Sequence, residues 1–209
     1  MKYIVYSLLL FSLLISCNRS SFKSKWTKLE APEYFKARFE TTKGNFEIEA
    51  YRKWSPQAVN RLYQLLKSGY YTNVPIYRVA PNFVVQWGGI DTVINKKWEQ
   101  YKVPDEPVTV SNAKGAIGFA RGGKESRYYE LFINLKDNPR LDTIIAAEVK
   151  GYPVIAKVVK GMEIVPTFFS YDPKIIMARF DTTKNAAFLF KNEYPKLDYI
   201  KKASLIKKK

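Results

Sequence analysis

The chain contains no histidine and a single cysteine among its 209 residues. Without histidine, Ser-His-Asp and Cys-His catalytic schemes and every histidine-ligated metal site are excluded. One cysteine can form neither an internal disulfide nor a cysteine-based zinc site. Any chemistry must therefore use arginine, lysine, carboxylates, tyrosine, serine, threonine or the backbone, and we expect neither a metal nor another cofactor.

Negative charge is scarce as well, because 35 Lys+Arg stand against 19 Asp+Glu and leave a formal net charge of +16. Such a surplus favours contact with anionic partners such as membrane phosphates, nucleic acid or acidic proteins, although solubility alone is the alternative explanation. The sequence carries no nucleic-acid recognition motif, so we do not expect nucleic acid as a partner. Aromatic residues, in contrast, are abundant, with 15 Tyr and 13 Phe, and they favour strands in a packed sheet or barrel.

The N-terminal segment holds an apolar run from Tyr3 to Leu14 that is too short to span a membrane and is typical of a secretion signal. It leads into Leu-Ile-Ser-Cys, which resembles the lipobox of bacterial lipoproteins, where cleavage precedes a cysteine that then carries lipid. We expect residues 1–16 to be a lipoprotein signal peptide, Cys17 to be the site of lipid attachment and residues 17–33 to be a tether. This predicts a protein of the bacterial cell envelope, lipid-anchored to a membrane in the periplasm or at the outer membrane. A plain signal peptide or a short anchor helix is the alternative.

The rest of the chain begins with apolar and polar residues that alternate on both sides of Lys43-Gly44-Asn45, which predicts a β-hairpin. A helix is predicted from Ser55 to Gly69, because Ser55 can cap it, Pro56 suits its first position and Gly69 ends it. Several short strand-like runs follow. Many short strands with one or two helices indicate an antiparallel barrel.

This pattern divides the chain into a barrel over residues 34–165, an insertion over 166–196, and a closing strand with a basic tail over 197–209. Periodicity is weak in the insertion, so we expect this segment on the surface of the barrel, outside the core. Its phenylalanines are Phe168, Phe169, Phe188 and Phe190.

One arginine, Arg78, stands directly before an apolar run in the sequence IYRVAPNFVVQWGG. Gln86 interrupts this run, and two glycines end it. Burying a charge without a partner is costly. Arg78 therefore either reaches water at the end of a strand or works at the mouth of an apolar pocket.

After the hairpin and the helix opened by Pro56, the motifs YRVAPNFVVQWGG, KGAIGFAR, ELFIN, RLD and VIAKVVKGMEIV follow one another. Their order resembles that of the cyclophilin family of peptidyl-prolyl isomerases, over roughly Phe35 to Val165. The resemblance implies a mainly β fold, a closed antiparallel eight-stranded barrel capped by two helices. It also implies a peptidyl-prolyl cis-trans isomerase whose partners are Pro-containing polypeptide clients. With the secretion signal, we expect it to assist the folding of extracytoplasmic proteins, and we expect a monomer.

Isomerisation of an X–Pro bond needs no nucleophile, metal or proton carrier, because its barrier of ~20 kcal/mol comes from the partial double bond of the amide. A catalyst holds the proline ring in an apolar pocket and aims a fixed donor at the amide nitrogen, which regains a lone pair as the amide twists. Arg78 matches the family's catalytic arginine. The resemblance implies that its guanidinium donates to the prolyl nitrogen and to the substrate carbonyl.

By the same resemblance, further positions match family residues that bind the substrate. Phe83 matches the floor of the proline pocket, and Phe132 and Leu141 match its aromatic and aliphatic walls. Gln86 would hold the substrate backbone or orient Arg78. For the apolar members, ordinary core packing is the alternative. The matching residues are Phe83, Val84, Gln86, Ala120, Phe132 and Leu141.

Other positions depart from the family pattern and are expected at the rim of the substrate site. Glu130 stands in place of a glutamine; an ionised carboxylate cannot donate a hydrogen bond, but it can pair with Arg78. Arg140 replaces a tryptophan, Tyr152 aligns with a histidine, and Trp87 is an extra residue that predicts a one-residue bulge. These changes leave two functions open: an active isomerase, or a catalytically weak or inactive binding module for Pro-containing segments.

Overall fold

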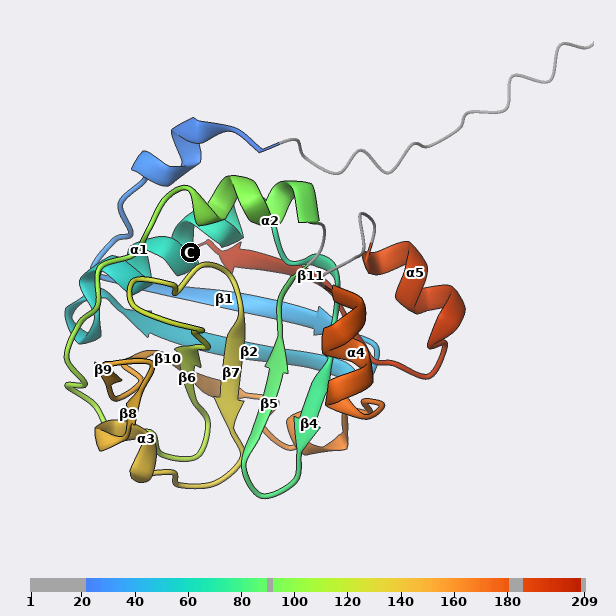
Figure 1. Ribbon diagram of the computed structural model, residues 1–209. Helices are drawn as coiled ribbons and strands as arrows, with labels where there is room; N and C mark the ends of the chain where they lie inside the picture. Colours follow the sequence, from blue (N-terminus) through green and yellow to red (C-terminus); the bar gives the residue numbers. More distant parts are fainter. Residues whose placement is uncertain (1–21, 90–91, 181–185, 208–209) are drawn as a thin grey trace, which may run out of the picture.

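The computed structural model describes residues 22–89, 92–180 and 186–207, so the expected signal peptide and Cys17 lie outside the described part of the chain. Most of the strands in that part form one nine-stranded sheet, and two more form a small separate sheet (Figure 1). The strands of the large sheet are β1 (Tyr34–Thr41), β2 (Gly44–Tyr51), β3 (Thr72–Pro75), β4 (Arg78–Ala80), β5 (Val84–Trp87), β6 (Ala116–Phe119), β7 (Leu131–Asn134), β10 (Val154–Lys160) and β11 (Tyr199–Ile206). The small sheet consists of β8 (Ile145–Ala146) and β9 (Val149–Lys150).

The predicted N-terminal hairpin is confirmed as β1 and β2. These strands pair without interruption from Tyr34 opposite Tyr51 to Thr41 opposite Gly44, so the turn is Thr42-Lys43, one position before the expected one. The inward-facing residues alternate as the sequence predicts and are all buried. They are Phe35, Ala37, Phe39, Phe46, Ile48 and Ala50.

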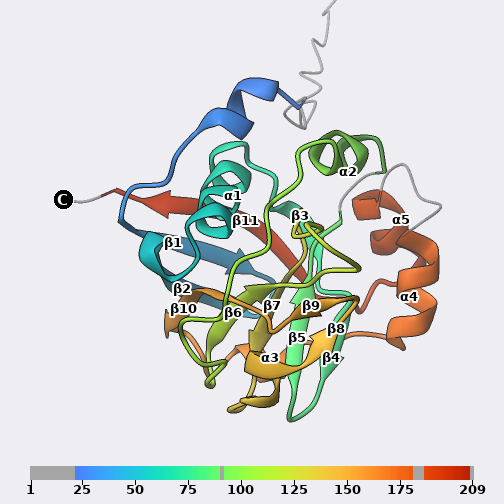
Figure 2. The same cartoon turned by 60° about the vertical axis from the view of Figure 1, so that its left-hand side comes forward.

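The large sheet has the strand order β3-β11-β1-β2-β10-β6-β7-β5-β4, and its ladders are antiparallel. Its edge strands β3 and β4 are neighbours in the sequence and are joined directly by Ile76 and Tyr77, so the sheet curls back toward itself (Figures 1 and 2). The predicted fold class, mainly β and antiparallel, is confirmed. The sheet is strongly curled and has nine strands instead of the expected eight, and among the described residues no ladder joins β3 to β4 to close it into a barrel.

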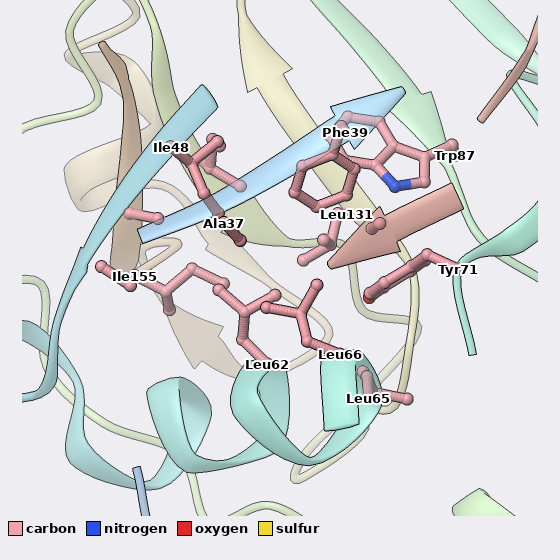
Figure 3. Packing of buried hydrophobic residues seen from close by; sticks show 14 of the residues in the cluster. Ala37, Phe39, Ile48, Leu62, Leu65, Leu66, Tyr71, Trp87, Leu131 and Ile155 are labelled. Atoms are coloured by element: carbon pink, nitrogen blue, oxygen red, sulfur yellow. The ribbon is translucent and has the colours of Figure 1, made fainter. Parts of the chain in front are cut away.

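The helix predicted after the hairpin, α1 (Pro56–Lys67), packs against the inner side of the curled sheet. It contributes Leu62, Leu65 and Leu66 to the same buried cluster as Phe39 and Trp87 of the strands (Figure 3). Complete burial of each leucine stabilises the fold by about 1.5–3 kcal/mol. The other helices are α2 (Thr92–Glu99), α3 (Arg140–Thr143), α4 (Pro173–Phe180) and α5 (Ala186–Glu193), with short 3-10 turns η1 (Ser24–Lys28), η2 (Arg52–Trp54) and η3 (Val165–Thr167).

The N-terminus of α1 is capped by a residue that is distant in the sequence. Ser55 occupies the predicted N-cap position, but its hydroxyl makes no bond to the helix backbone and donates to the Glu106 carboxylate instead. That carboxylate accepts the N–H groups of Gln57 and Ala58, at 2.8 and 3.1 Å. A negative group at this end of a helix satisfies open donors and interacts favourably with the helix dipole.

The expected tether is packed against the domain from Phe22 onward. The Gln64 side chain on α1 donates to the backbone carbonyls of Thr27 and Leu29, at 3.1 and 2.9 Å. The ring of Phe22 contacts Trp98 of α2 edge-on, with centroids 5.2 Å apart. The described part of the expected tether therefore belongs to the folded domain.

The segment expected to be a surface insertion contains η3, α4 and α5 and lies near the β3–β4 edge of the sheet (Figures 1 and 2). Phe168 differs from the expectation, because it is buried in the main core cluster. Ile176, Phe190 and Leu197 form a second buried cluster with Tyr77, the residue before Arg78. Phe169 is exposed, and the side chain of Phe188 lies outside the described part. That residues 166–196 as a whole are an insertion stays a prediction.

A search of the described residues for a helix long and apolar enough to cross a membrane finds none.

Candidate active site

Arg78 is fixed by its place in the sheet. β4 pairs with β5 so that Arg78 lies opposite Gln86, and its Nη1 donates to Oε1 of Gln86 over 3.2 Å. The guanidinium carbon lies 5.7 Å from the centroid of the Phe83 ring. Arg78 is partly exposed and Gln86 is buried, so one side of the guanidinium is anchored while the residue still reaches the surface.

The next strands continue this row of residues across the sheet. Gln86 lies opposite Phe132 on β7, and Phe132 lies opposite Gly118 on β6. A Cβ atom at position 118 would stand 2.8 Å from Cζ of Phe132, so glycine leaves the space that this ring occupies. The sheet register therefore aligns Arg78, Gln86, Phe132 and Gly118 on one face.

An apolar cluster lies on this face, apart from the main core, and we call it the site cluster. It consists of buried Val84, Phe132 and Leu141, with partly buried Ala80, Phe83, Ala120, Ile144 and Tyr152 packed against them. The structure thus brings together every apolar residue expected to bind the substrate. Sequence reasoning missed Ala80 and Ile144. Ile144 stands three positions after Leu141, at the end of α3, and this helical spacing was the available signal.

The expected bulge at Trp87 is wrong. β5 pairs with β7 in unbroken register from Val84 to Trp87. Because strand side chains alternate, Trp87 points away from Gln86 into the main core, where its ring lies 5.8 Å from Phe39. The extra residue therefore adds core volume and leaves the substrate face undisturbed.

Glu130 lies beside Gly88, directly after β5, and outside the site cluster. Its carbonyl accepts the N–H of Ala120 at 3.0 Å. Burial raises the pKa of Tyr77 well above its usual range, and the Glu130 carboxylate acts in the same direction. The negative charge of Glu130 thus acts on Tyr77, the residue before Arg78. A pairing of Glu130 with Arg78 stays a prediction.

The two other rim positions differ from each other. Arg140 is exposed on the first turn of α3 and is not part of the site cluster, while Leu141 beside it is buried there. Tyr152 does join the cluster, and its ring meets Phe132 edge-on at 80°, with centroids 5.9 Å apart. A cavity of about 470 Å³ is lined by Asp142, Thr143 and Lys150 together with residues 107–111, none of which belongs to the site cluster.

The arrangement can hold an apolar ring beside a fixed cationic donor. Among the described residues, no group of three or more His, Cys, Asp or Glu side chains is placed to hold a metal ion. A guanidinium held beside an apolar surface suits positioning and electrostatic stabilisation.

The chain is similar to known peptidyl-prolyl isomerases. The family described as cyclophilin type peptidyl-prolyl cis-trans isomerase/CLD matches residues 36–174. A peptidyl-prolyl cis-trans isomerase of Acinetobacter baylyi is 32% identical over 127 residues, which cover 60% of this chain and 66% of the relative. Peptidyl-prolyl cis-trans isomerase A of Dickeya dadantii is 35% identical over 126 residues, covering 59% and 65%. The match thus spans just under two thirds of these relatives' length.

The fold also resembles that of a solved structure, the cyclophilin type peptidyl-prolyl cis-trans isomerase of Cryptosporidium parvum. Its TM-score is 0.61 at 18% identity, and the likeness covers 84% of this chain and 99% of that one. At this identity the likeness concerns the fold alone. It agrees with the family match, which extends over more than half of the sequence. The chain belongs to the cyclophilin-type peptidyl-prolyl cis-trans isomerase family.

Proposed function

We propose that this protein is a peptidyl-prolyl cis-trans isomerase and that Arg78 is its catalytic residue. The observation that carries the proposal is the hydrogen bond from Arg78 to Gln86, which fixes a cationic donor beside the site cluster. As an X–Pro amide twists, its nitrogen regains a lone pair that Arg78 can stabilise. A donor already fixed in place costs no reorganisation at that moment, so it acts mainly on the transition state.

The site cluster binds the proline ring in this mechanism. Phe83, Phe132 and Leu141 offer an apolar surface to the ring, and Gln86 keeps the guanidinium in its orientation. Tyr152 closes one side of the ring site through its edge-on contact with Phe132. The substrates are polypeptides that expose a proline, because recognition relies on the ring and on the neighbouring backbone.

A binding module with little turnover is the second candidate, and Glu130 is the observation that favours it. This residue takes the place of a glutamine that would donate to the substrate backbone, and an ionised carboxylate only accepts hydrogen bonds. Such a protein would bind Pro-containing segments without accelerating their isomerisation.

The experiment compares the wild type with Arg78→Ala and Arg78→Lys in an isomerisation assay on a short peptide with one Ala-Pro bond. Arg78→Ala should lower kcat/KM, with a loss of transition-state stabilisation of about 2–4 kcal/mol. Peptide binding should change little. Arg78→Lys should recover little activity, because an ammonium lacks the planar fork of a guanidinium.

Arg38→Ala is the matched control, since Arg38 is an exposed arginine that pairs with Glu47 on β1 and β2. Equal rates in all four proteins would remove Arg78 from the mechanism. Peptide binding without activity in the wild type would favour the binding module.

The same protein is proposed to act outside the cytoplasm, anchored by a lipid on Cys17 to a membrane of the bacterial envelope. The Leu-Ile-Ser-Cys sequence and the lack of a second cysteine support this location. Its clients would then be exported proteins that fold near the membrane. In the native host, Cys17→Ser should remove the mass that an attached lipid adds to the protein. It should also release the protein from membranes at high salt. Unchanged mass and membrane association would contradict the anchor.

A further inference from the structure

Arg121 binds three backbone carbonyls of one small hairpin. It directly follows Ala120 of the site cluster, and its Nη1 donates to the carbonyl of Gly151 at 2.7 Å. Its Nη2 donates to the carbonyls of Val149 and Ala146, at 2.7 and 3.4 Å. One guanidinium thus joins both strands of the β8–β9 hairpin and the residue that follows it.

The hairpin turn that Arg121 holds is strained. Ala147 and Glu148 form its two central positions, and both have positive φ, 48° and 62°. Turns of this type favour Asn, Asp and Gly, because a side chain that begins with an ordinary Cβ is crowded at positive φ. Backbone strain of this kind persists only where the surroundings hold it in place, and it is concentrated at binding sites.

The same guanidinium also stacks on a wall of the site cluster. Its central carbon lies 4.0 Å from the centroid of the Tyr152 ring, a distance typical of cation–π contacts. Tyr152 in turn contacts Phe132 edge-on. A continuous contact therefore runs from Arg121 through Tyr152 to Phe132, the residue opposite Gln86 in the sheet.

We propose that Arg121 is a positioning residue, which fixes the Tyr152 wall of the proline site by clamping the β8–β9 hairpin and stacking on the Tyr152 ring. The proposal rests on the proposed function for its effect on catalysis, but the clamp itself can be measured without turnover. A planar guanidinium suits this role, because it offers several donors in one plane and a flat face to the ring. Burial lowers the pKa of Arg121, yet an arginine stays charged at neutral pH.

Arg78 and Arg121 should affect different kinetic constants. Arg78 would act on the twisted amide, so its loss would lower kcat. Arg121 lies behind the wall and touches no reacting atom, so its loss would loosen the ring site and raise KM while kcat stays near the wild-type value. This split separates a positioning role from general damage to the fold, which would lower kcat as well.

The first test is a double-mutant cycle on the binding of a short peptide with one Ala-Pro bond, followed by NMR titration. Arg121→Ala and Tyr152→Leu should each weaken binding by about tenfold, and the double variant should do little further harm, because both remove the same contact. Arg121→Lys should give an intermediate loss, since it keeps the charge without the fork. Losses that multiply to about a hundredfold in the double variant would overturn the proposal.

The second test needs no ligand and uses amide hydrogen exchange. The N–H groups of Gly151 and Tyr152 donate to the carbonyls of Ile144 and Leu141, so they report directly on the hairpin. Arg121→Ala should speed their exchange by about tenfold or more while β1 and β2 keep their protection, because a clamp acts on a local unit. Arg38→Ala, the control on β1, should leave the hairpin unchanged.

The outcomes distinguish this inference from the proposed function. A wild type without isomerase activity would count against the function, whereas exchange and binding would still report on the clamp. Unchanged exchange at Gly151 and Tyr152 in Arg121→Ala would overturn the clamp even in an active enzyme. Faster exchange throughout the large sheet would show a general structural role and would overturn it as well.

Discussion

The floor and the rim of the proposed active site are held by different kinds of bond. We use floor here for the strand row of Arg78, Gln86, Phe132 and Gly118, whose positions follow from the ladders between β4, β5, β7 and β6. We use rim here for segments 101–106, 120–130 and 144–152, whose backbone carbonyls accept hydrogen bonds from arginine side chains. The floor therefore depends on strand register and many shared bonds, whereas the rim depends on a few individual side chains.

Two buried arginines act on the rim in addition to Arg121. Arg61 on α1 donates to the carbonyls of Tyr128 and Tyr101, and burial lowers its pKa to about 10. Arg127 donates to the carbonyl of Pro104 and lies near the carboxylates of Asp105 and Glu106. A buried cation needs such partners, because a charge removed from water without them is strongly destabilising.

The largest effect should come from the acid that connects the rim to the core. Glu106→Ala would remove the carboxylate that caps α1 and would leave Arg127 with the Pro104 carbonyl and the more distant Asp105 carboxylate, 3.7 Å away. Loss of one partner of a buried ion pair costs about 3–5 kcal/mol, and loss of a cap costs about 1 kcal/mol more. Urea unfolding of the variant should show a decrease of this size.

Glu33→Ala is the control for this prediction, because Glu33 also pairs with an arginine, Arg52, but is 73% exposed. Its loss should change the free energy of unfolding by less than about 1 kcal/mol. If both variants unfolded at the same urea concentration, the buried network would not support the rim.

A substitution in the floor should lower both stability and catalysis. In Gly118→Ala the new methyl would stand 2.8 and 3.0 Å from two atoms of the Phe132 ring, close to the carbonyl of Pro153. Overpacking of this kind costs about 1–3 kcal/mol, and the displaced ring should lower kcat/KM by about tenfold or more, because it forms a wall of the proline site.

Gly122→Ala is the matched control in the rim, where a Cβ would meet nothing within 4 Å. It should retain wild-type isomerase activity and stability. Gly118→Ala with unchanged kcat/KM would show that the floor tolerates movement of Phe132, which would weaken the contrast between floor and rim.

The smallest effect should come from relief of the strained rim turn. Ala147→Gly removes the Cβ from a residue at φ 48° without removing any of the Arg121 bonds to the hairpin. It should raise the free energy of unfolding by up to about 1 kcal/mol, with unchanged KM. Ala113→Gly, in an exposed loop at ordinary φ, should be destabilising in the same urea titration. If both variants lost the same free energy of unfolding, the turn at Ala147 would not be strained.

The sequence predicted the floor better than the rim for a physical reason. Arg78, Phe83 and Gln86 fall within one short motif, and strand alternation fixes which side chains share a face. Phe132 and Leu141 joined them through the family resemblance. The hairpin followed from the same alternation, and the fold class followed from the many short strands and from the family resemblance.

The rim follows no such periodicity. Arg121 and Glu106 act on backbone groups that lie tens of residues away, and no spacing in the sequence indicates a bond from a side chain to a distant carbonyl. Ser55 shows the limit well: its N-cap position was predicted correctly, but the group that caps the helix is Glu106. Trp87 was misplaced because an added residue was taken for a bulge, although strand alternation carries it into the core.

The arginine-to-carbonyl bonds of the rim have a consequence for how the protein loses activity on heating. Each interior strand of the large sheet shares its bonds with two neighbours, so this part of the sheet opens as a cooperative unit. The β8–β9 hairpin shares no ladder with that sheet. It can therefore detach when the hydrogen bonds from Arg121 to its carbonyls break. Such sub-global opening requires less free energy than complete unfolding. Loss of the proposed isomerase activity should therefore precede the melting of the large sheet, and on cooling the protein should regain that activity without refolding its core.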